Sequence, residues 1–387
     1  MSDPVTFRPL GKFEWPSTAV NRGFDLAMAQ FRKKFRRNDK DGGIDAEYLV
    51  PLTPETLDRV CEPPSHFPLI RELDATLDDW LTQTASTDRV KMIVLPPCDR
   101  DDLLSHWAEI QDLQVFGTDR RMAELDGLDD PDASPLIPKL ERRFLRTRGG
   151  LHDIRQLLDR LSMMERRIII GCNSWAWQFL RKSCEIDLIF AAPITFQAFD
   201  KKRLRNWLGA LSLDSNDAET LCFRSASSGQ DVFGNGEGET EISAYMTDLA
   251  KASIGVPWVA WHLWKDSLHT VKPTDESENK NEGQVGDKQA QTDTRETVWV
   301  TDIKPPTVPN RNDQNAFLVL HAILIHGGLT QDQIVQTVPL VTYTHVIASL
   351  MRSGLIDKVD GVYHCIPAAY PVIRDGLNNS GYPVDIL

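Results

Sequence analysis

The sequence lacks the patterns that would place it in a membrane or build a metal site. No stretch approaches the about 18 consecutive apolar residues that a membrane-spanning helix needs, and residues 1–16 contain no apolar signal core. The six cysteines include no C-x-x-C pair and no neighbouring H-x₃-H pattern, which argues against a zinc site or a disulfide framework. These absences predict a cytoplasmic protein without a structural metal.

Basic residues are too few to balance the acidic ones. Asp and Glu number 56 against 43 Lys and Arg, so the formal net charge is −13. A surface of this sign repels nucleic acid and anionic membranes unless a local patch compensates. One basic run follows an apolar stripe at helical spacing and consists of Arg32, Lys33, Lys34, Arg36 and Arg37. It is either a surface for an anionic partner or a set of cations that favours the C-terminal dipole of its own helix.

The length of 387 residues leaves room for two or three domains. Residues 272–296 contain a single aliphatic side chain, Val285, and cannot bury enough apolar surface to offset their ordering entropy. We therefore expect a flexible linker there. The remaining chain divides into a helical N-terminal extension (1–85), an α/β core (86–195), a helical part (196–271) and a C-terminal module (297–387).

The core region alternates strands with helices. Buried strands are expected at 91–95 and 167–173, and a further strand begins near 136. Helices are expected at 99–108 and 151–161. This order favours a mostly parallel sheet with helices on both faces.

Three segments of this region carry a family resemblance. The stretch RRIIIGCNSWAWQFL resembles the sensor-1 strand of AAA+ and related signal-transduction ATPases, with Asn173 at the position that reads the nucleotide phosphate. The stretches at 186–208 and 242–268 are similar to the segment that opens the lid and to the lid helices of that family. The resemblance implies a P-loop-type core over 86–195 and a helical lid over 196–271.

The chemistry of a phosphate-binding loop is missing from this outline. No G-x-x-x-x-G-K-[ST] motif exists in the chain, and no glycine lies between Met92 and Gly117. Asp101 and Asp102 stand where Lys and Thr belong, and two prolines, Pro96 and Pro97, supply no N–H group. The stretch therefore predicts a capped helix start, with Asp as the cap, in place of a phosphate cradle.

The other two nucleotide positions are also altered. Pro138 and Lys139 lie where a Walker B strand would end in acids, and Trp258 lies where the sensor-2 Arg belongs. The resemblance implies a pseudo-ATPase with no cofactor, and ATP or ADP is the only cofactor to consider. If a nucleotide binds, the candidate residues are Asp99, Asp101, Asp102, Asn173 and Trp258.

The C-terminal module resembles a winged helix-turn-helix domain. Helix signals end at Gly327-Gly328, Thr330 is placed to cap a second helix, and Asp360-Gly361 predicts a hairpin turn. Residues 313–387 contain three cations against six aspartates, a balance of −3. DNA affinity depends on neutralised phosphates, so this balance favours contacts with protein.

The leading hypothesis is therefore a non-catalytic regulatory or adaptor protein that binds a protein partner or itself. The alternatives are a nucleotide-binding switch of the signal-transduction ATPase class and a DNA-binding regulator. Besides the basic run, the candidate partner surface of the third helix of the module consists of Tyr343, His345 and Arg352.

Overall fold

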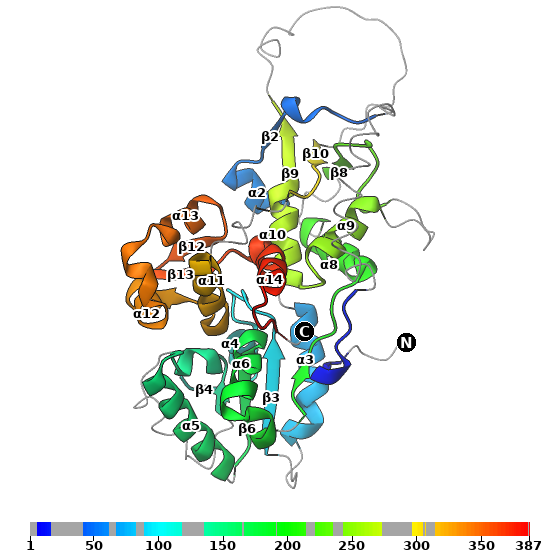
Figure 1. The fold of residues 1–387 in the computed structure, drawn as a ribbon. Coiled ribbons are helices and arrows are strands. Elements are labelled where there is room, and N and C mark those ends of the chain that lie inside the picture. Colours follow the sequence, from blue (N-terminus) through cyan, green and yellow to red (C-terminus); the bar gives the residue numbers. More distant parts are fainter. Residues whose placement is uncertain are drawn as a thin grey trace, which may run out of the picture. The chain divides into compact units, whose positions relative to one another are not determined.

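The computed structural model in Figure 1 describes residues 6–16, 42–61, 67–82, 89–117, 135–164, 166–190, 192–213, 221–234, 243–272, 296–304, 306, 314–385 and 387. Two compact units divide the chain, and each is described by itself. Unit 1 comprises Met1–Trp15, His66–Ala198 and Pro305–Leu387, and unit 2 comprises Pro16–Ser65 and Phe199–Lys304. The basic run at 32–37 and residues 273–295 of the expected linker lie outside the described residues.

Unit 1 contains a six-stranded sheet with the order β1-β7-β3-β6-β5-β4. Five strands run parallel: β3 (Val90–Leu95), β4 (Gln114–Val115), β5 (Pro135–Ile137), β6 (Ile168–Asn173) and β7 (Ile194–Thr195). The edge strand β1 (Arg8–Pro9) is antiparallel to β7. The α/β class with a mostly parallel sheet is thus confirmed.

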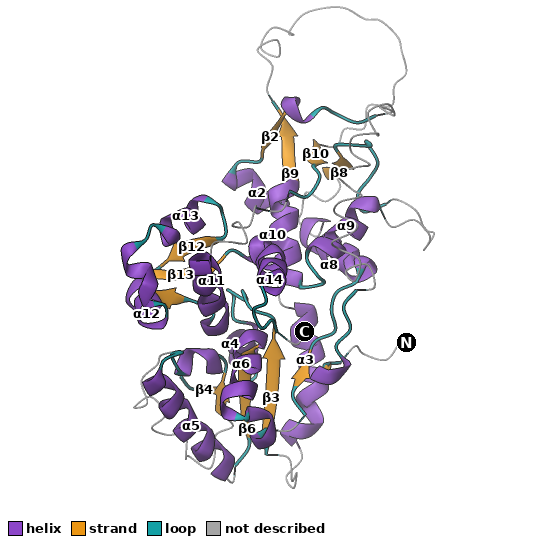
Figure 2. Cartoon of the chain, in the orientation of Figure 1, coloured by secondary structure: helices purple, strands orange, loops and turns teal. Residues whose placement is uncertain are grey.

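Unit 1 also contains α3 (Phe67–Thr82), α4 (Leu103–Ile110), α5 (Arg148–Met163), α6 (Ser174–Cys184) and α7 (Ile186–Ile189). Figure 2 shows α3, α4, α5 and α6 beside the sheet. Every residue of β6 is buried, as the β-branched run Ile168-Ile169-Ile170 predicts for a strand covered on both faces. Gly171 allows close packing here, because a Cβ at this position would lie 2.1 Å from the carbonyl oxygen of Pro138. Strand β6 pairs with β3 on one side and with β5 on the other.

The rest of unit 1 is a winged helix with the element order helix, strand, helix, helix, hairpin and helix. Its elements are α11 (Gln314–His326), β11 (Leu329–Thr330), α12 (Gln331–Thr337), the 3₁₀ turn η6 (Pro339–Tyr343), α13 (Val346–Arg352), β12 (Ile356–Val359), β13 (Val362–Cys365), the 3₁₀ turn η7 (Pro367–Ala369) and α14 (Tyr370–Asn379). The three strands form a sheet in the order β11-β13-β12.

The local signals of the winged helix act as the sequence predicts. Thr330 forms a capping box with Gln333 at the start of α12. The wing turns at Asp360 and Gly361 with φ values of 49° and 82°, the left-handed pair that a type I′ hairpin requires. The glycine that follows the end of α11 is also required, because a Cβ on Gly328 would lie 2.4 Å from the His364 ring.

Unit 2 corrects two expectations. It contains α2 (Pro54–Val60), α8 (Lys201–Leu213), α9 (Ala244–Ala252) and α10 (Pro257–Ser267), together with a four-stranded sheet in the order β2-β9-β10-β8. The strands are β2 (Leu49–Pro51), β8 (Leu221–Ser225), β9 (Leu268–Val271) and β10 (Glu296–Val300). The part at 196–271 is thus not purely helical, and the extension at 1–85 supplies β2 to this sheet and β1 to the sheet of unit 1, as well as helices.

The expected boundary at residue 297 also moves. Strand β10 pairs in parallel with β8 and belongs to unit 2, so the winged helix begins after it. The winged helix itself shares one compact unit with the parallel sheet. Sequence composition revealed the polar segment before β10, but not the long-range pairing that follows it.

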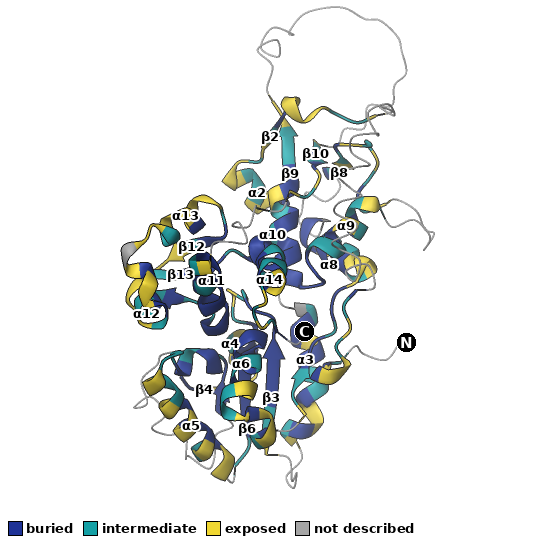
Figure 3. Cartoon of the chain, viewed as in Figure 1, coloured by how far each residue is buried: buried dark blue, intermediate teal, exposed yellow. Residues whose placement is uncertain are grey.

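The tryptophans of α10 belong to the core of unit 2. Figure 3 shows α10 coloured mostly as buried, and Trp258 and Trp264 are 3% and 0% exposed. The ring of Trp264 lies 5.3 Å from that of Phe233, 5.5 Å from Phe223 and 5.6 Å from Tyr245, centroid to centroid. These contacts are the geometry of packed aromatic rings.

Among the described helices, none is long and apolar enough to cross a membrane.

Candidate functional site

A pocket of about 230 Å³ lies within unit 1, beyond the carboxyl ends of the parallel strands. The chain leaves β3 at Pro96, β5 at Pro138 and β6 at Asn173, and all three residues line the pocket. Ligands of open parallel sheets bind at this edge. The opposite wall comes from the winged helix, through α11 and the wing hairpin.

The loop that opens the pocket caps a helix. Asp102 adopts a left-handed conformation with φ 53°, and its side chain accepts a hydrogen bond from the Ser105 N–H at 3.3 Å. Asp99 accepts from the Leu103 N–H at 2.9 Å. Asp101 is exposed. Two of the three aspartates thus satisfy N–H groups at the start of α4, which is the role expected from their residue type.

Lys139 supplies the cation that lies beside these aspartates. Its Nζ lies 3.1 Å from Asp102 Oδ2 and donates to the Asp99 carbonyl oxygen at 3.3 Å. The side chains of the pair are 13% and 24% exposed, so the attraction is only partly screened by water. Lys139, which follows β5, therefore neutralises Asp102 at the start of α4.

Asn173 connects the sheet to the winged helix. Its Oδ1 accepts from the Ala176 N–H at 2.7 Å, which caps α6. Its Nδ2 donates to the carbonyl oxygens of Leu324 and Ile325, both at 3.2 Å. The last carbonyls of a helix have no partner within the helix, so the amide satisfies the end of α11.

Glu141 and His326 support the same contact. Glu141 Oε2 accepts from the Asn173 N–H at 3.1 Å. Burial raises the pKa of this carboxyl, although Lys139 opposes the rise. His326, which is fully buried, accepts at Nε2 from the Arg146 N–H at 3.2 Å, and its Nδ1 donates to the Glu141 carbonyl oxygen at 3.4 Å. His326 carries no local motif, so sequence patterns did not indicate its role here.

An ion pair holds the wing at the pocket. Arg100 Nη2 lies 2.6 Å from Asp357 Oδ1 and donates to the Cys365 carbonyl oxygen at 3.4 Å. Arg100 follows β3 and Asp357 lies on β12, so the contact spans the core and the winged helix. No local sequence pattern predicts this ion pair, because the partners are 257 residues apart.

A buried network around Asp385 makes a third contact between the core and the winged helix. Asp385 Oδ2 accepts from Ser174 Oγ at 2.6 Å and from the Tyr370 hydroxyl at 2.9 Å. Arg374 Nε donates to Asp385 Oδ1 at 2.8 Å, and the guanidinium lies 4.7 Å from the centre of the Trp15 ring. The Asp385 side chain is 0% exposed. Its charge is therefore stabilised by these hydrogen-bond partners and not by water.

Burial raises the pKa of the thiols that line the pocket, which favours their neutral form. Burial raises the pKa of Cys98 to about 12 and that of Cys365 well above its usual value. Neutral thiols are poor nucleophiles and metal ligands. The six cysteines are free, and within the described ranges no group of three His, Cys, Asp or Glu side chains could hold a metal ion.

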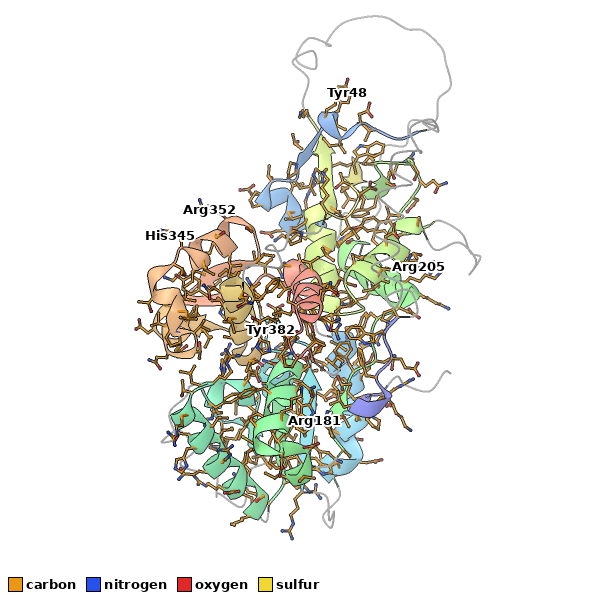
Figure 4. The ribbon with its side chains drawn as sticks, in the orientation of Figure 1. Tyr48, Arg181, Arg205, His345, Arg352 and Tyr382 are labelled. Carbon is orange, nitrogen blue, oxygen red and sulfur yellow. The ribbon has the colours of Figure 1, made fainter. Side chains whose placement is uncertain are left out.

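The remaining candidate residues lie elsewhere. Trp258 is buried in α10 of unit 2. His345 and Arg352 are exposed at the start and end of α13 (Figure 4), whereas Tyr343 lies in the preceding 3₁₀ turn and not on the third helix. The basic run from Arg32 to Arg37 lies outside the described residues.

Comparison with known proteins leaves the family open. No family model matches the chain. No curated protein matches it. One solved structure with similarity is Cdc6p from Pyrobaculum aerophilum. It is 11% identical, the match covers 86% of this chain and 98% of that chain, and the TM-score is 0.30. A TM-score this low carries no argument about the fold, which the strand order and the elements of the winged helix define.

Proposed function

We propose that this protein is a non-catalytic regulatory or adaptor protein of the cytoplasm. Its core keeps the element order that resembles an AAA+ ATPase, and its winged helix serves for contacts with protein. The observation that carries the proposal is the bond from Asn173 Nδ2 to the end of α11. The side chain at the phosphate-reading position is committed to the chain's own helix.

The other residues around the pocket support the same proposal. Phosphate binding needs backbone N–H groups and an available cation. Pro96 and Pro97 have no N–H groups, and Lys139 is paired with Asp102. The pocket of about 230 Å³ is also smaller than the roughly 300–1,000 Å³ of typical ligand sites.

The charges of the winged helix favour protein over DNA. Arg374 is bound to Asp385, which leaves Arg352 and Lys358 as its exposed cations. Asp332 and Asp360 are also exposed and oppose them. Two cations cannot supply the series of phosphate contacts on which duplex binding depends.

Phosphate release tests the proposal. Purified full-length protein with ATP and Mg²⁺ should release phosphate at the rate of an enzyme-free blank, because within the described residues no group of three His, Cys, Asp or Glu side chains could hold a metal ion. A turnover that disappears in the Asn173→Ser variant would contradict the proposal.

The pocket itself favours one second candidate, a nucleotide-binding switch without hydrolysis. Its position at the carboxyl edge of the sheet is where such a ligand would lie. Saturable nucleotide binding without phosphate release would support this candidate over the first.

A further inference from the structure

The outer side of the winged helix carries a long stretch without formal charge. Residues 333–351 contain no Asp, Glu, Lys or Arg, in a chain with a net charge of −13. The stretch covers most of α12, the turn η6 and most of α13. We call the exposed part of this stretch the neutral face. It consists of Gln336, Pro339, Leu340, Thr342, Thr344, His345, Ala348, Ser349 and Met351.

The neutral face is partly apolar. Leu340 is 66% exposed and Met351 is 41% exposed, although Leu350 beside Met351 is buried in the winged helix. Figure 4 shows His345 and Arg352 on the outer side of this domain. Large exposed apolar side chains on a charge-poor surface are typical of interaction sites.

Opposite charges bound the stretch in sequence. Asp332 precedes it on α12, and Arg352 follows it at the end of α13. Both residues are exposed. Within the described part of the chain, neither forms an ion pair. Two identical surfaces that each carry one exposed cation and one exposed anion can pair, because the cation of each meets the anion of the other.

We propose that the neutral face binds the same face of a second copy of this chain, about a two-fold axis. In such a contact every pair of residues occurs twice, once in each direction. Arg352 of each copy therefore pairs with Asp332 of the other. Two acidic molecules repel over most of their surfaces, and a face without charge removes that repulsion where they meet. The proposal rests on the proposed function of the winged helix as a protein-contact module and names its partner.

Sedimentation velocity of the full-length protein tests this contact. The chain should be a dimer at about 50 µM, which a micromolar dissociation constant would give. Leu340→Asp should weaken the dimer at least about tenfold, because it places a charge in the apolar contact. The matched control is Leu188→Asp, at a residue of α7 that is 79% exposed, and it should leave the dimer unchanged.

A charge exchange tests the symmetry. Arg352→Asp and Asp332→Arg should each weaken self-association, since each places like charges opposite one another. An equimolar mixture of the two variants should recover a dimer, because every contact in the mixed pair joins Arg to Asp. A monomer at all concentrations, a dimer indifferent to Leu340→Asp, or no recovery on mixing would overturn the proposal. A monomer that also releases no phosphate would leave the proposed non-catalytic function intact.

Discussion

The Asn173 side-chain amide donates to the carbonyl oxygen of Leu324 at 3.2 Å, across 151 residues of sequence. The tip of the central strand β6 thereby holds the end of the first helix of the winged helix. The wing adds the Arg100–Asp357 ion pair, and the chain near Asp385 adds a buried polar network. The winged helix is thus part of the structure that closes the carboxyl edge of the sheet.

Two substitutions at Asn173 should separate its two roles. Asn173→Ala removes both the α6 cap and the bonds to α11, and should lower the free energy of unfolding by about 2–4 kcal/mol. Asn173→Ser keeps capping chemistry but is too short to reach both carbonyls of α11, so its cost should be smaller, about 1–2 kcal/mol. Urea unfolding measures both. Equal costs would show that the contact with α11 contributes nothing.

Removing the Asp385 carboxylate should be among the most damaging single changes in unit 1. Asp385→Ala leaves Arg374 and Ser174 without their shared partner, at a cost of about 3–5 kcal/mol in urea unfolding. Asp360→Asn is the matched control, because Asn also accepts the left-handed conformation of the exposed wing turn and should change stability little. A small effect of Asp385→Ala would mean that the buried network is dispensable.

His321 should make stability fall in mild acid. Burial, with the nearby Arg146 guanidinium, lowers the pKa of its imidazole from 6.5 to about 4. Between these values the unfolded chain binds a proton that the native state does not, so the free energy of unfolding rises with pH. The contribution, up to about 3 kcal/mol, is fully present above pH 6.5 and is lost as the pH falls towards 4.

Urea titrations of wild type and His321→Gln across this pH range give the measurement. The difference in the free energy of unfolding between the two proteins should shift in favour of the variant as the pH falls. A difference that stays constant from neutral pH to pH 4 would contradict the lowered pKa.

Duplex DNA should not bind at physiological salt. Non-specific binding commonly has dissociation constants of about 10⁻⁴–10⁻⁶ M and depends on Lys and Arg contacts to phosphate. Fluorescence anisotropy of a mixed-sequence duplex with full-length protein at about 0.15 M salt should show no sub-micromolar binding. Tight binding that Arg352→Ala weakens would favour the DNA-binding regulator.

Local sequence signals predicted much of this fold. The buried strands near 91–95 and 167–173, the cap at Thr330 and the turn at Asp360 depend on neighbouring residues, and the structure contains each of them. The strands of unit 2 were missed for the opposite reason. Strand β10 is defined by its pairing with β8, from Glu296↔Leu221 to Val300↔Ser225, and no local pattern encodes a partner so distant.

The candidate site was predictable only in part. Proline and aspartate near 96–102 indicate helix capping in place of phosphate binding, because one lacks N–H groups and the other carries the wrong charge. What faces the pocket could not be inferred. The contacts of Asn173 with Leu324 and of Arg100 with Asp357 depend on where the winged helix lies, which only the tertiary structure shows.

Thermal unfolding with nucleotide tests the central claim most directly. A ligand that binds the native state raises the unfolding temperature as its concentration exceeds the dissociation constant. With ATP or ADP and Mg²⁺ at about 2 mM, above the roughly 1 µM–1 mM range of enzyme Michaelis constants, the unfolding temperature should equal that without nucleotide. A saturable rise that Asn173→Ser abolishes would contradict it.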